Sequence, residues 1–328
     1  MGRNSKNEPS IREIAAAAGV STATVSRVLN RSCHVSAEVR DRVLAVVSNS
    51  GYAPTIATSS NLFGVMINSG EELSVAAYLN QVIRELSRHL FSAGYDLQIF
   101  SKSHFPYILR NTFRAVAVFS GEDCKFFAER DIPCVVINNH SADGYCVVTN
   151  HRESLQIAVE HLLSLGHRKI AYLHNSTSVW GSAERMDGYR ETLIASGAGY
   201  DKNLCAEYSD LRYTLEEHLR RLLSFSPTAL IVEGEHQGLP ADHVLKQLGV
   251  RIPEELSLIT FENAQGSQFM YPEHTTVCQD FDLLGKCAAE TLMILAFHPE
   301  KSGSIPPVQI LHNHLILRNS CARLGRNG

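Results

Sequence analysis

The sequence lacks the features that mark membrane, secreted and metal-stabilised proteins. It has no apolar run of about 18 residues, the length that crosses a bilayer, so no transmembrane helix is expected. Residues 1–6 are polar and lead into no apolar segment, which predicts no secretory signal. The eight cysteines are scattered without a CxxC pair, a pattern that favours reduced, mostly buried thiols over a zinc site or a disulfide framework. We therefore expect a cytoplasmic protein.

The sequence also lacks the short motifs of common enzyme classes, including GxSxG, HExxH, the P-loop and GxGxxG. Two features are still compatible with chemistry. His312 and His314 share one face of a predicted strand, and a Glu235–His236 pair follows another strand. Neither is accompanied by a third metal ligand or a nucleophile. We therefore expect a surface histidine pair, and predict neither an enzyme nor a bound cofactor or metal.

Length and charge point to a small head on a larger body. A chain of 328 residues is too long for one compact core, and with 44% hydrophobic residues it is too apolar to be wholly disordered. Residues 1–60 contain seven basic and four acidic side chains, a net charge of +3, whereas the remainder carries −7. A basic head on an acidic body is typical of a head that binds a polyanion, although +3 alone is also compatible with chance.

The head has the pattern of three short helices. Ser10 and Glu13 have the spacing of a capping box, and apolar residues then recur at helical spacing until Gly19, which is able to end a helix in a left-handed conformation. Ser21 caps a second helix, and Ser36 begins a third. The predicted helices cover residues 11–18, 22–29 and 36–50. Small residues at the first turn allow close, steep packing of two helices, which predicts a helix-turn-helix; the alternative is a generic three-helix module.

The exposed side of the second predicted helix carries the candidate DNA contacts. In a helix-turn-helix the N-terminal end of this helix enters the major groove. Thr22 and Ala23 are candidates for base-edge contacts, and Arg27 for a guanine edge or a phosphate. The candidates for phosphate contacts, which position the protein without reading sequence, are Thr24, Ser26, Asn30 and His34.

Four segments make the chain similar to a known family. They are IREIAAAAGVSTATVSRVLN at residues 11–30, HLLSLGHRKIAY at 161–172, ERMDGY at 184–189 and TTVCQDF at 275–281. In this order and spacing they resemble the LacI/GalR family of transcriptional regulators over nearly the whole chain. The resemblance implies a homodimer, an operator palindrome in double-stranded DNA, and a small-ligand body similar to periplasmic sugar-binding proteins.

The body can also be interpreted without the family. Predicted strands at 62–67, 95–100, 115–119, 134–137, 169–173, 229–233 and 257–261 alternate with predicted helices at 76–94, 152–165, 184–196, 214–224 and 239–248. Such alternation predicts an α/β fold with parallel sheets covered on both faces, here in two lobes with a ligand cleft between them. The expected division is a head at 1–54, a shortened linker at 55–61, a first lobe at about 62–150 and 281–308, and a second lobe at about 151–280 and 309–328.

Residues that follow strand ends are the effector candidates, because ligands of open α/β sheets bind beyond the carboxyl ends of strands. The resemblance implies an effector-contacting arginine at Arg185, with a surface salt bridge as the alternative. Glu262 and Asn263 stand where the family has two aspartates, so a typical pocket is in doubt here. The other candidates are Asn150, Phe281, Tyr78, and Trp180 in the loop before Arg185; Phe281 and Tyr78 are equally compatible with core packing.

Two segments are short for this architecture. Residues 55–61 are rich in poor helix formers, so a hinge helix that inserts into the minor groove is not assured. Fourteen residues between Phe100 and Ala115 are few for a parallel crossover, which suggests a reduced lobe with weak operator binding or altered coupling. The sequence thus predicts a ligand-responsive regulator, a repressor first, with a carbohydrate ahead of a purine as effector. The alternatives are a ligand-independent regulator with a decayed pocket and a solute-binding protein.

Overall fold

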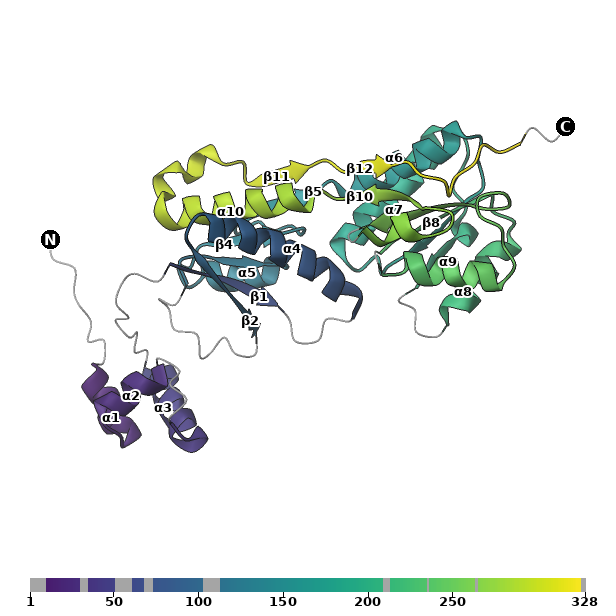
Figure 1. The fold of residues 1–328 in the computed structure, drawn as a ribbon. Helices are drawn as coiled ribbons and strands as arrows, with labels where there is room; N and C mark the ends of the chain where they lie inside the picture. Colours follow the sequence, from purple (N-terminus) through teal and green to yellow (C-terminus); the bar gives the residue numbers. More distant parts are fainter. Residues whose placement is uncertain are drawn as a thin grey trace.

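The computed structural model describes most of the chain as a helical head and two α/β lobes (Figure 1). The described residues are 10–29, 35–50, 61–67, 73–102, 113–208, 213–234, 236–262 and 265–325. Within these ranges no helix combines the length and apolar character needed to cross a bilayer.

The head consists of α1 (Ile11–Ala18), α2 (Thr22–Leu29) and α3 (Ala37–Ser50). The predicted capping box is present, since the Ser10 hydroxyl accepts from the Glu13 N–H and the Glu13 carboxylate accepts from the Ser10 N–H at 2.5 Å. Gly19 ends α1 with a φ of 65°, the left-handed conformation that favours glycine. The buried side chains that join the three helices are Ile14, Ala15, Ala18, Val25, Val28, Val43 and Val47.

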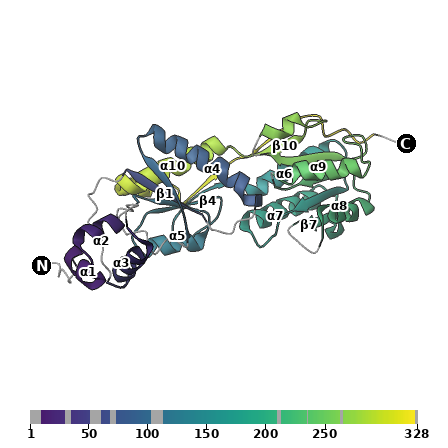
Figure 2. The ribbon, with the colours of Figure 1, turned by 60° about the horizontal axis from the view of Figure 1, so that its bottom comes forward.

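The first lobe is a six-stranded sheet in the order β11-β5-β4-β3-β1-β2. Its strands are β1 (Leu62–Ile67), β2 (Asp96–Ser101), β3 (Val116–Val118), β4 (Cys134–Ile137), β5 (Tyr145–Thr149) and β11 (Val308–Leu311). The helices α4 (Leu73–Ser92) and α10 (Phe281–Phe297) cover one face and α5 (Gly121–Ala128) the other, as Figure 2 shows. Every strand pairing in this sheet is parallel, and the inner strands β1, β3, β4 and β5 are buried between the two helical layers, whereas the edge strands β2 and β11 are partly exposed.

The second lobe has the same design, with the strand order β12-β10-β9-β8-β6-β7. Its strands are β6 (Ile170–His174), β7 (Cys205–Glu207), β8 (Ala229–Val232), β9 (Ser257–Glu262), β10 (Thr275–Cys278) and β12 (His314–Ile316), of which β12 is antiparallel to β10. One face is covered by α6 (His151–Ser164) and α7 (Trp180–Ala195), the other by α8 (Leu215–Ser224) and α9 (Gly238–Gln247). Short 3₁₀ helices lie at Lys202–Leu204, Gln265–Phe269 and Pro299–Ser304.

The chain passes between the lobes at three places: after β5, after β10 and after β11. A buried side chain supports two of these crossings, because the Asn313 amide donates to the Asn150 carbonyl at 2.8 Å and to the Ser154 hydroxyl at 2.7 Å. The third crossing lies between Leu311 and His314, a few residues beyond the expected boundary at 308, since all of β11 pairs with β5.

Three expectations about the elements need correction. β5, β7, β10 and β11 are absent from the predicted strands, and α5 and α10 from the predicted helices; β7 is only three residues long, and β5 follows a short loop with no helix before it. Trp180 is the first residue of α7 rather than part of a loop, so Arg185 lies in the second turn. The sheet of the first lobe is not reduced, since both sheets have six strands. Residues 103–112 and the linker residues 55–60, on which the shortening hypotheses rested, lie outside the described residues.

Candidate functional site

A cavity of about 330 Å³ lies between the carboxyl ends of the two sheets. The first lobe contributes residues from α4 and from the ends of β3 and β4, namely Tyr78, Leu79, Phe119, Ile137, Asn138 and Asn139, and Gln279 comes from the crossing that follows β10. The second lobe contributes residues from α6, α7 and the ends of β6 to β9: His151, Asn175, Val179, Gly181, Ser182, Arg185, Tyr208, Glu233, Gly234, His236 and Phe261. This is the place where parallel α/β sheets bind ligands, and its lining combines aromatic rings with amide groups.

A buried ion pair between Arg185 and Glu233 forms the second-lobe wall of the cavity. The Arg185 Nη1 donates to the Glu233 Oε1 at 2.8 Å, and the two side chains are 14% and 2% exposed. The Glu233 carboxylate also accepts from the Ser182 hydroxyl at 2.6 Å and from the Tyr172 hydroxyl at 2.5 Å. Burial raises the pKa of Glu233, but the Arg185 charge and these hydrogen bonds outweigh burial and lower the pKa below its ordinary value. The carboxylate is therefore charged in the folded protein.

His151, the first residue of α6, lies on the other side of Arg185. Its Nδ1 is 3.1 Å from the Arg185 Nη2, which places the hydrogen of the neutral ring on Nε2. Burial, with the Arg185 charge adding to it, lowers the pKa of His151 well below its ordinary value. The ring also meets Trp180 edge to face, with centroids 5.3 Å apart. His151 is thus a neutral imidazole that holds the guanidinium in place.

Two nitrogen atoms at this wall are buried without a hydrogen-bond partner in the described structure: the Arg185 Nε and the His151 Nε2. A buried N–H that lacks a partner costs free energy unless a ligand or water supplies an acceptor. The Arg185 guanidinium also lies over the Phe261 ring, 5.2 Å from its centroid. The wall therefore contains two buried donors whose hydrogen bonds are not satisfied within the described structure.

A polar network links the cavity to the crossings between the lobes. The Asn138 amide donates to the Gln279 side-chain oxygen at 3.1 Å, and the Asn138 oxygen accepts from the Thr149 N–H at 2.7 Å. The Thr149 hydroxyl, at the end of β5, completes the set at 3.2 Å from the same Gln279 oxygen. Asn138 and Gln279 line the cavity and Thr149 and Gln279 adjoin two crossings, so this network joins the cavity directly to the connection between the lobes.

The predicted effector residues are only partly brought together. Arg185 and Tyr78 line the cavity. Trp180 lies behind it, against His151. Asn150 instead caps α6, where its side chain accepts from the Glu153 N–H at 3.2 Å. Phe281 is buried in the first-lobe core and contacts the Tyr78 ring at a centroid distance of 5.9 Å, the alternative that the sequence left open.

Two further effector candidates are described only in part. The backbone of Glu262 pairs with Cys278 at the end of β9, so it lies next to two cavity residues, Phe261 and Gln279. Its side chain and all of Asn263 lie outside the described residues. Their roles remain predictions.

Sequence reasoning missed most of the cavity lining. Glu233 is the last residue of the strand predicted at 229–233, and Asn138, Asn175 and Gln279 are single amides. In the structure each of the four directly follows a strand (β8, β4, β6 or β10), but only Asn138 directly follows a strand that the sequence predicts. His236, from the Glu235–His236 pair that the sequence places after a strand, lines the cavity.

The head presents the predicted DNA-contacting side of α2 to solvent. Thr22, Ala23 and Arg27 are exposed, and Thr24 and Ser26 are half-buried. The Ser21 hydroxyl caps the helix by accepting from the Thr24 N–H at 3.1 Å. The other predicted contacts, Asn30 and His34, lie outside the described residues.

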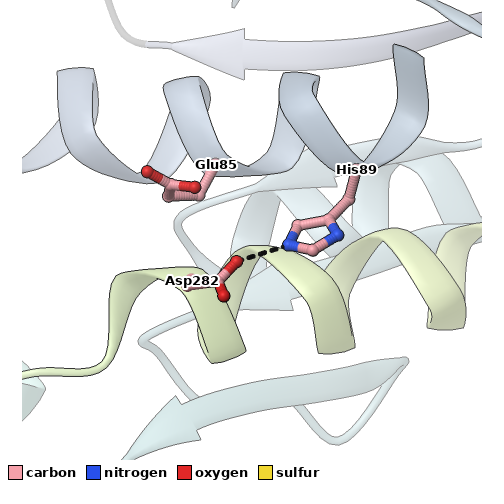
Figure 3. A group of neighbouring side chains, drawn as sticks. All are labelled: Glu85, His89 and Asp282. Atoms are coloured by element: carbon pink, nitrogen blue, oxygen red, sulfur yellow. Dashed lines mark hydrogen bonds and ion pairs between the residues drawn. The ribbon is translucent and has the colours of Figure 1, made fainter. Parts of the chain in front are cut away.

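One group of side chains in the described structure has the composition of a metal site: Glu85 and His89 on α4 and Asp282 on α10 (Figure 3). The His89 Nε2 lies 2.7 Å from the Asp282 Oδ1. Arg88 is paired with both carboxylates, at 2.8 Å from Glu85, and Arg84 with Glu85 at 2.7 Å. The carboxylate oxygens are thus already occupied by guanidinium groups, so we interpret the group as an ion-pair network that joins α4 to α10.

The two histidines of the predicted pair have different surroundings. His312 is 80% exposed and its Nδ1 lies 3.0 Å from both Glu153 carboxylate oxygens, whereas His314 is an exposed residue of β12.

Two family models match the chain. A model for bacterial regulatory proteins of the lacI family matches residues 10–55, which contain the three head helices. A model for a periplasmic binding protein-like domain matches residues 159–321, which contain most of the second lobe together with α10 and β11 of the first lobe.

Relatives and solved structures match along nearly the full length. The HTH-type transcriptional repressor PurR of Actinobacillus pleuropneumoniae serotype 3 (strain JL03) is 24% identical over 338 residues, covering 96% of this chain and 99% of PurR. A complex of the transcriptional regulator CelR with cellobiose has a TM-score of 0.68 at 23% identity, covering 95% of this chain and 99% of CelR. The lac repressor dimer bound to operator and the anti-inducer ONPF also has a TM-score of 0.68, at 21% identity, with 96% and 100% coverage. The last two likenesses show the fold.

Proposed function

We propose that this chain, whose head matches the lacI family model and which is 24% identical to the repressor PurR over nearly its full length, is a sequence-specific transcriptional repressor whose operator affinity depends on a small molecule held between its lobes. One observation carries this proposal: the chain joins a helix-turn-helix with an exposed α2 to a two-lobed body that has a cavity of about 330 Å³. A regulator needs both parts, whereas an enzyme needs neither the head nor an operator. We place its action in the cytoplasm, where the DNA is.

A carbohydrate is the effector that the cavity favours, with a purine as the second candidate. The side-chain oxygens of Asn138, Asn139 and Asn175 already accept hydrogen bonds within the protein, so their remaining amide N–H groups are the donors to ligand hydroxyl groups, and the rings of Phe119 and Tyr208 offer apolar faces. The cellobiose complex of CelR supports the same class. We also propose that Glu262 and Asn263 contribute, because the backbone of Glu262 lies between cavity residues. The formed cavity disfavours the alternative of a decayed pocket.

The proposed coupling is a population shift. The effector binds one angle between the lobes better than another, and the lobes of a homodimer set the spacing of its two heads. Heads at the wrong spacing cannot occupy two adjacent major grooves, so the avidity of the dimer is lost. The proposed contacts to DNA are Thr22, Ala23, Thr24, Ser26, Arg27, Asn30 and His34.

The test separates the head from the body. Double-stranded DNA selected from a random pool by the full-length protein serves as the operator, and thermal unfolding is followed against a panel of sugars, sugar phosphates and nucleosides. A ligand at 100 times its dissociation constant adds about 2.7 kcal/mol of stability, which such a scan resolves easily. We expect one or more ligands to stabilise the protein and to change its affinity for the selected DNA.

Two variants serve as crossed controls. Arg27→Ala is expected to weaken DNA binding and to leave the ligand-induced shift intact, since Arg27 is exposed on α2. Glu262→Ala is expected to remove the ligand-induced shift and to leave DNA binding without ligand intact. Loss of both properties in either variant contradicts the division into head and body. No stabilising ligand together with ligand-independent DNA binding refutes the effector part of the proposal.

A further inference from the structure

The surroundings of Glu233 are those of a permanent counter-charge rather than of a ligand contact. Its two oxygens accept from the Arg185 guanidinium, the Ser182 and Tyr172 hydroxyls and, at 3.4 Å, the Asn175 N–H. A carboxylate has about four lone-pair sites, so four donors satisfy it. With only 1% of its surface exposed, Glu233 has no oxygen left for a bound molecule.

This carboxylate neutralises the cation of the cavity wall. Arg185 is the only Arg or Lys, and Glu233 the only Asp or Glu, among the described residues that line the cavity. A ligand carboxylate or phosphate at Arg185 would therefore share one guanidinium with a second, buried anion. Like charges in a partly desolvated site repel strongly, because the effective dielectric constant there is far below that of water.

The donors that remain suit an uncharged acceptor. Arg185 uses Nη1 for Glu233 and holds Nη2 against His151, which leaves its buried Nε without a partner. A planar anion needs two parallel N–H groups of one guanidinium for bidentate binding, and both terminal nitrogens of Arg185 already have a partner within the protein. A single hydroxyl or carbonyl oxygen needs only one donor.

We propose that Glu233 determines the charge class of the effector: by neutralising Arg185 it makes the cavity select uncharged hydroxyl- or carbonyl-bearing ligands and reject their anionic derivatives, such as sugar acids and sugar phosphates. This inference rests on the proposed function, since it concerns the same cavity. It adds a residue that contacts no ligand and acts through Arg185, which makes Glu233 a positioning and specificity residue.

The test uses inorganic phosphate as the probe, so it needs no knowledge of the effector. Isothermal titration calorimetry is run on the full-length wild-type protein, on Glu233→Gln, and on Asp242→Asn as the matched control. Asp242 is also a carboxylate with 1% of its surface exposed in the second lobe, but it pairs with Lys246 and does not line the cavity. We expect Glu233→Gln to bind phosphate at least about tenfold more tightly than the wild type and the control do, because one unit of repulsive charge is removed. Adding Arg185→Gln should abolish that gain.

A second measurement keeps the inference testable if Glu233→Gln does not fold. The wild type and the double variant Arg185→Gln/Glu233→Gln are expected to bind phosphate equally weakly, because the wall carries no net charge in either protein. Tighter phosphate binding by the wild type than by the double variant overturns the inference, as does equal binding by the wild type and a folded Glu233→Gln. Neither result depends on the ligand panel, so the inference is able to fail while the proposed function stands. If no ligand in the thermal-unfolding panel stabilises the protein, the effector part of the proposed function fails, and this result is independent of the phosphate titration.

Discussion

Replacing Arg185 by methionine tests the buried ion pair through stability alone. Methionine keeps much of the apolar volume but leaves the Glu233 carboxylate, with 1% of its surface exposed, without its cation. Removing one partner of a buried pair costs about 3–5 kcal/mol, because the remaining charge is desolvated and uncompensated. For a domain of this size each kcal/mol lowers the unfolding midpoint by about 2–4 °C, so a decrease of about 6–20 °C is expected.

The double variant Arg185→Met/Glu233→Gln isolates the charge. If the loss of stability in Arg185→Met comes from the unpaired Glu233 carboxylate, the double variant is more stable than Arg185→Met alone. The double-mutant cycle of Arg185 and Glu233 then has a large coupling energy. The matched control is Arg251→Met, which breaks the exposed Arg251–Glu255 pair on the surface and is expected to leave the midpoint unchanged within error.

The pH dependence has a definite sign. In the wild type the pKa of Glu233 is lowered, so its contribution to stability is present at neutral pH and is lost as the pH falls. In Arg185→Met, burial without a cation raises the pKa, and protonation on acidification relieves the unpaired charge. The stability gap between wild type and variant should therefore narrow from pH 7 towards pH 4 in thermal unfolding followed by circular dichroism. A constant gap, or a double variant no more stable than the single one, refutes the reasoning.

The remaining predictions concern packing and protonation. A methyl group on Gly285 of α10 would lie 2.6 Å from the Glu85 Cβ and 2.7 Å from the Glu85 carbonyl carbon on α4, so Gly285→Ala should destabilise the protein by about 1–3 kcal/mol. Gly303→Ala, which meets nothing within 4 Å, should have no such effect in the same urea titration. Burial and the Arg185 charge lower the pKa of His151 in the folded protein. The free energy of unfolding therefore decreases as the pH falls below about 6.5, the ordinary pKa of histidine. His151→Gln should therefore unfold at a midpoint that varies less between pH 7 and pH 5 than that of the wild type; an unchanged slope contradicts the assignment of a neutral imidazole.

The head and the architecture were predictable from the sequence because local signals determine them. The ends of α1 follow from the Ser10–Glu13 box and from Gly19, and both features act within one helical turn. The alternation of apolar strands with amphipathic helices likewise predicts two parallel sheets. Strands without a local sequence signal were not predicted: β7 is three residues long and depends on tertiary contacts, namely its pairing with β6 and the burial of Ala206 in the core.

The cavity was far less predictable, because its residues meet only through the tertiary fold. Arg185 was found through the family resemblance, but its partner Glu233 lies 48 positions away in the chain. Nothing local distinguishes Glu233 from an exposed glutamate at a strand end. Asn150 shows the opposite error, since an asparagine at a crossing is equally suited to line a cavity or to cap the helix that follows, and here it caps α6.

The three crossings have a consequence for how the protein is made. The core of the first lobe includes Phe281, Leu284 and Leu311, which leave the ribosome only after the whole strand-and-helix series of the second lobe up to β10. Until then the apolar face of α4, with Val82, Leu86 and Leu90, has no α10 to cover it. A nascent chain therefore carries an incomplete first lobe through most of its synthesis while the inserted lobe is already able to form its sheet. Premature termination anywhere before β11 leaves the N-terminal lobe incomplete. Truncated products should therefore aggregate and should not replace the full-length protein.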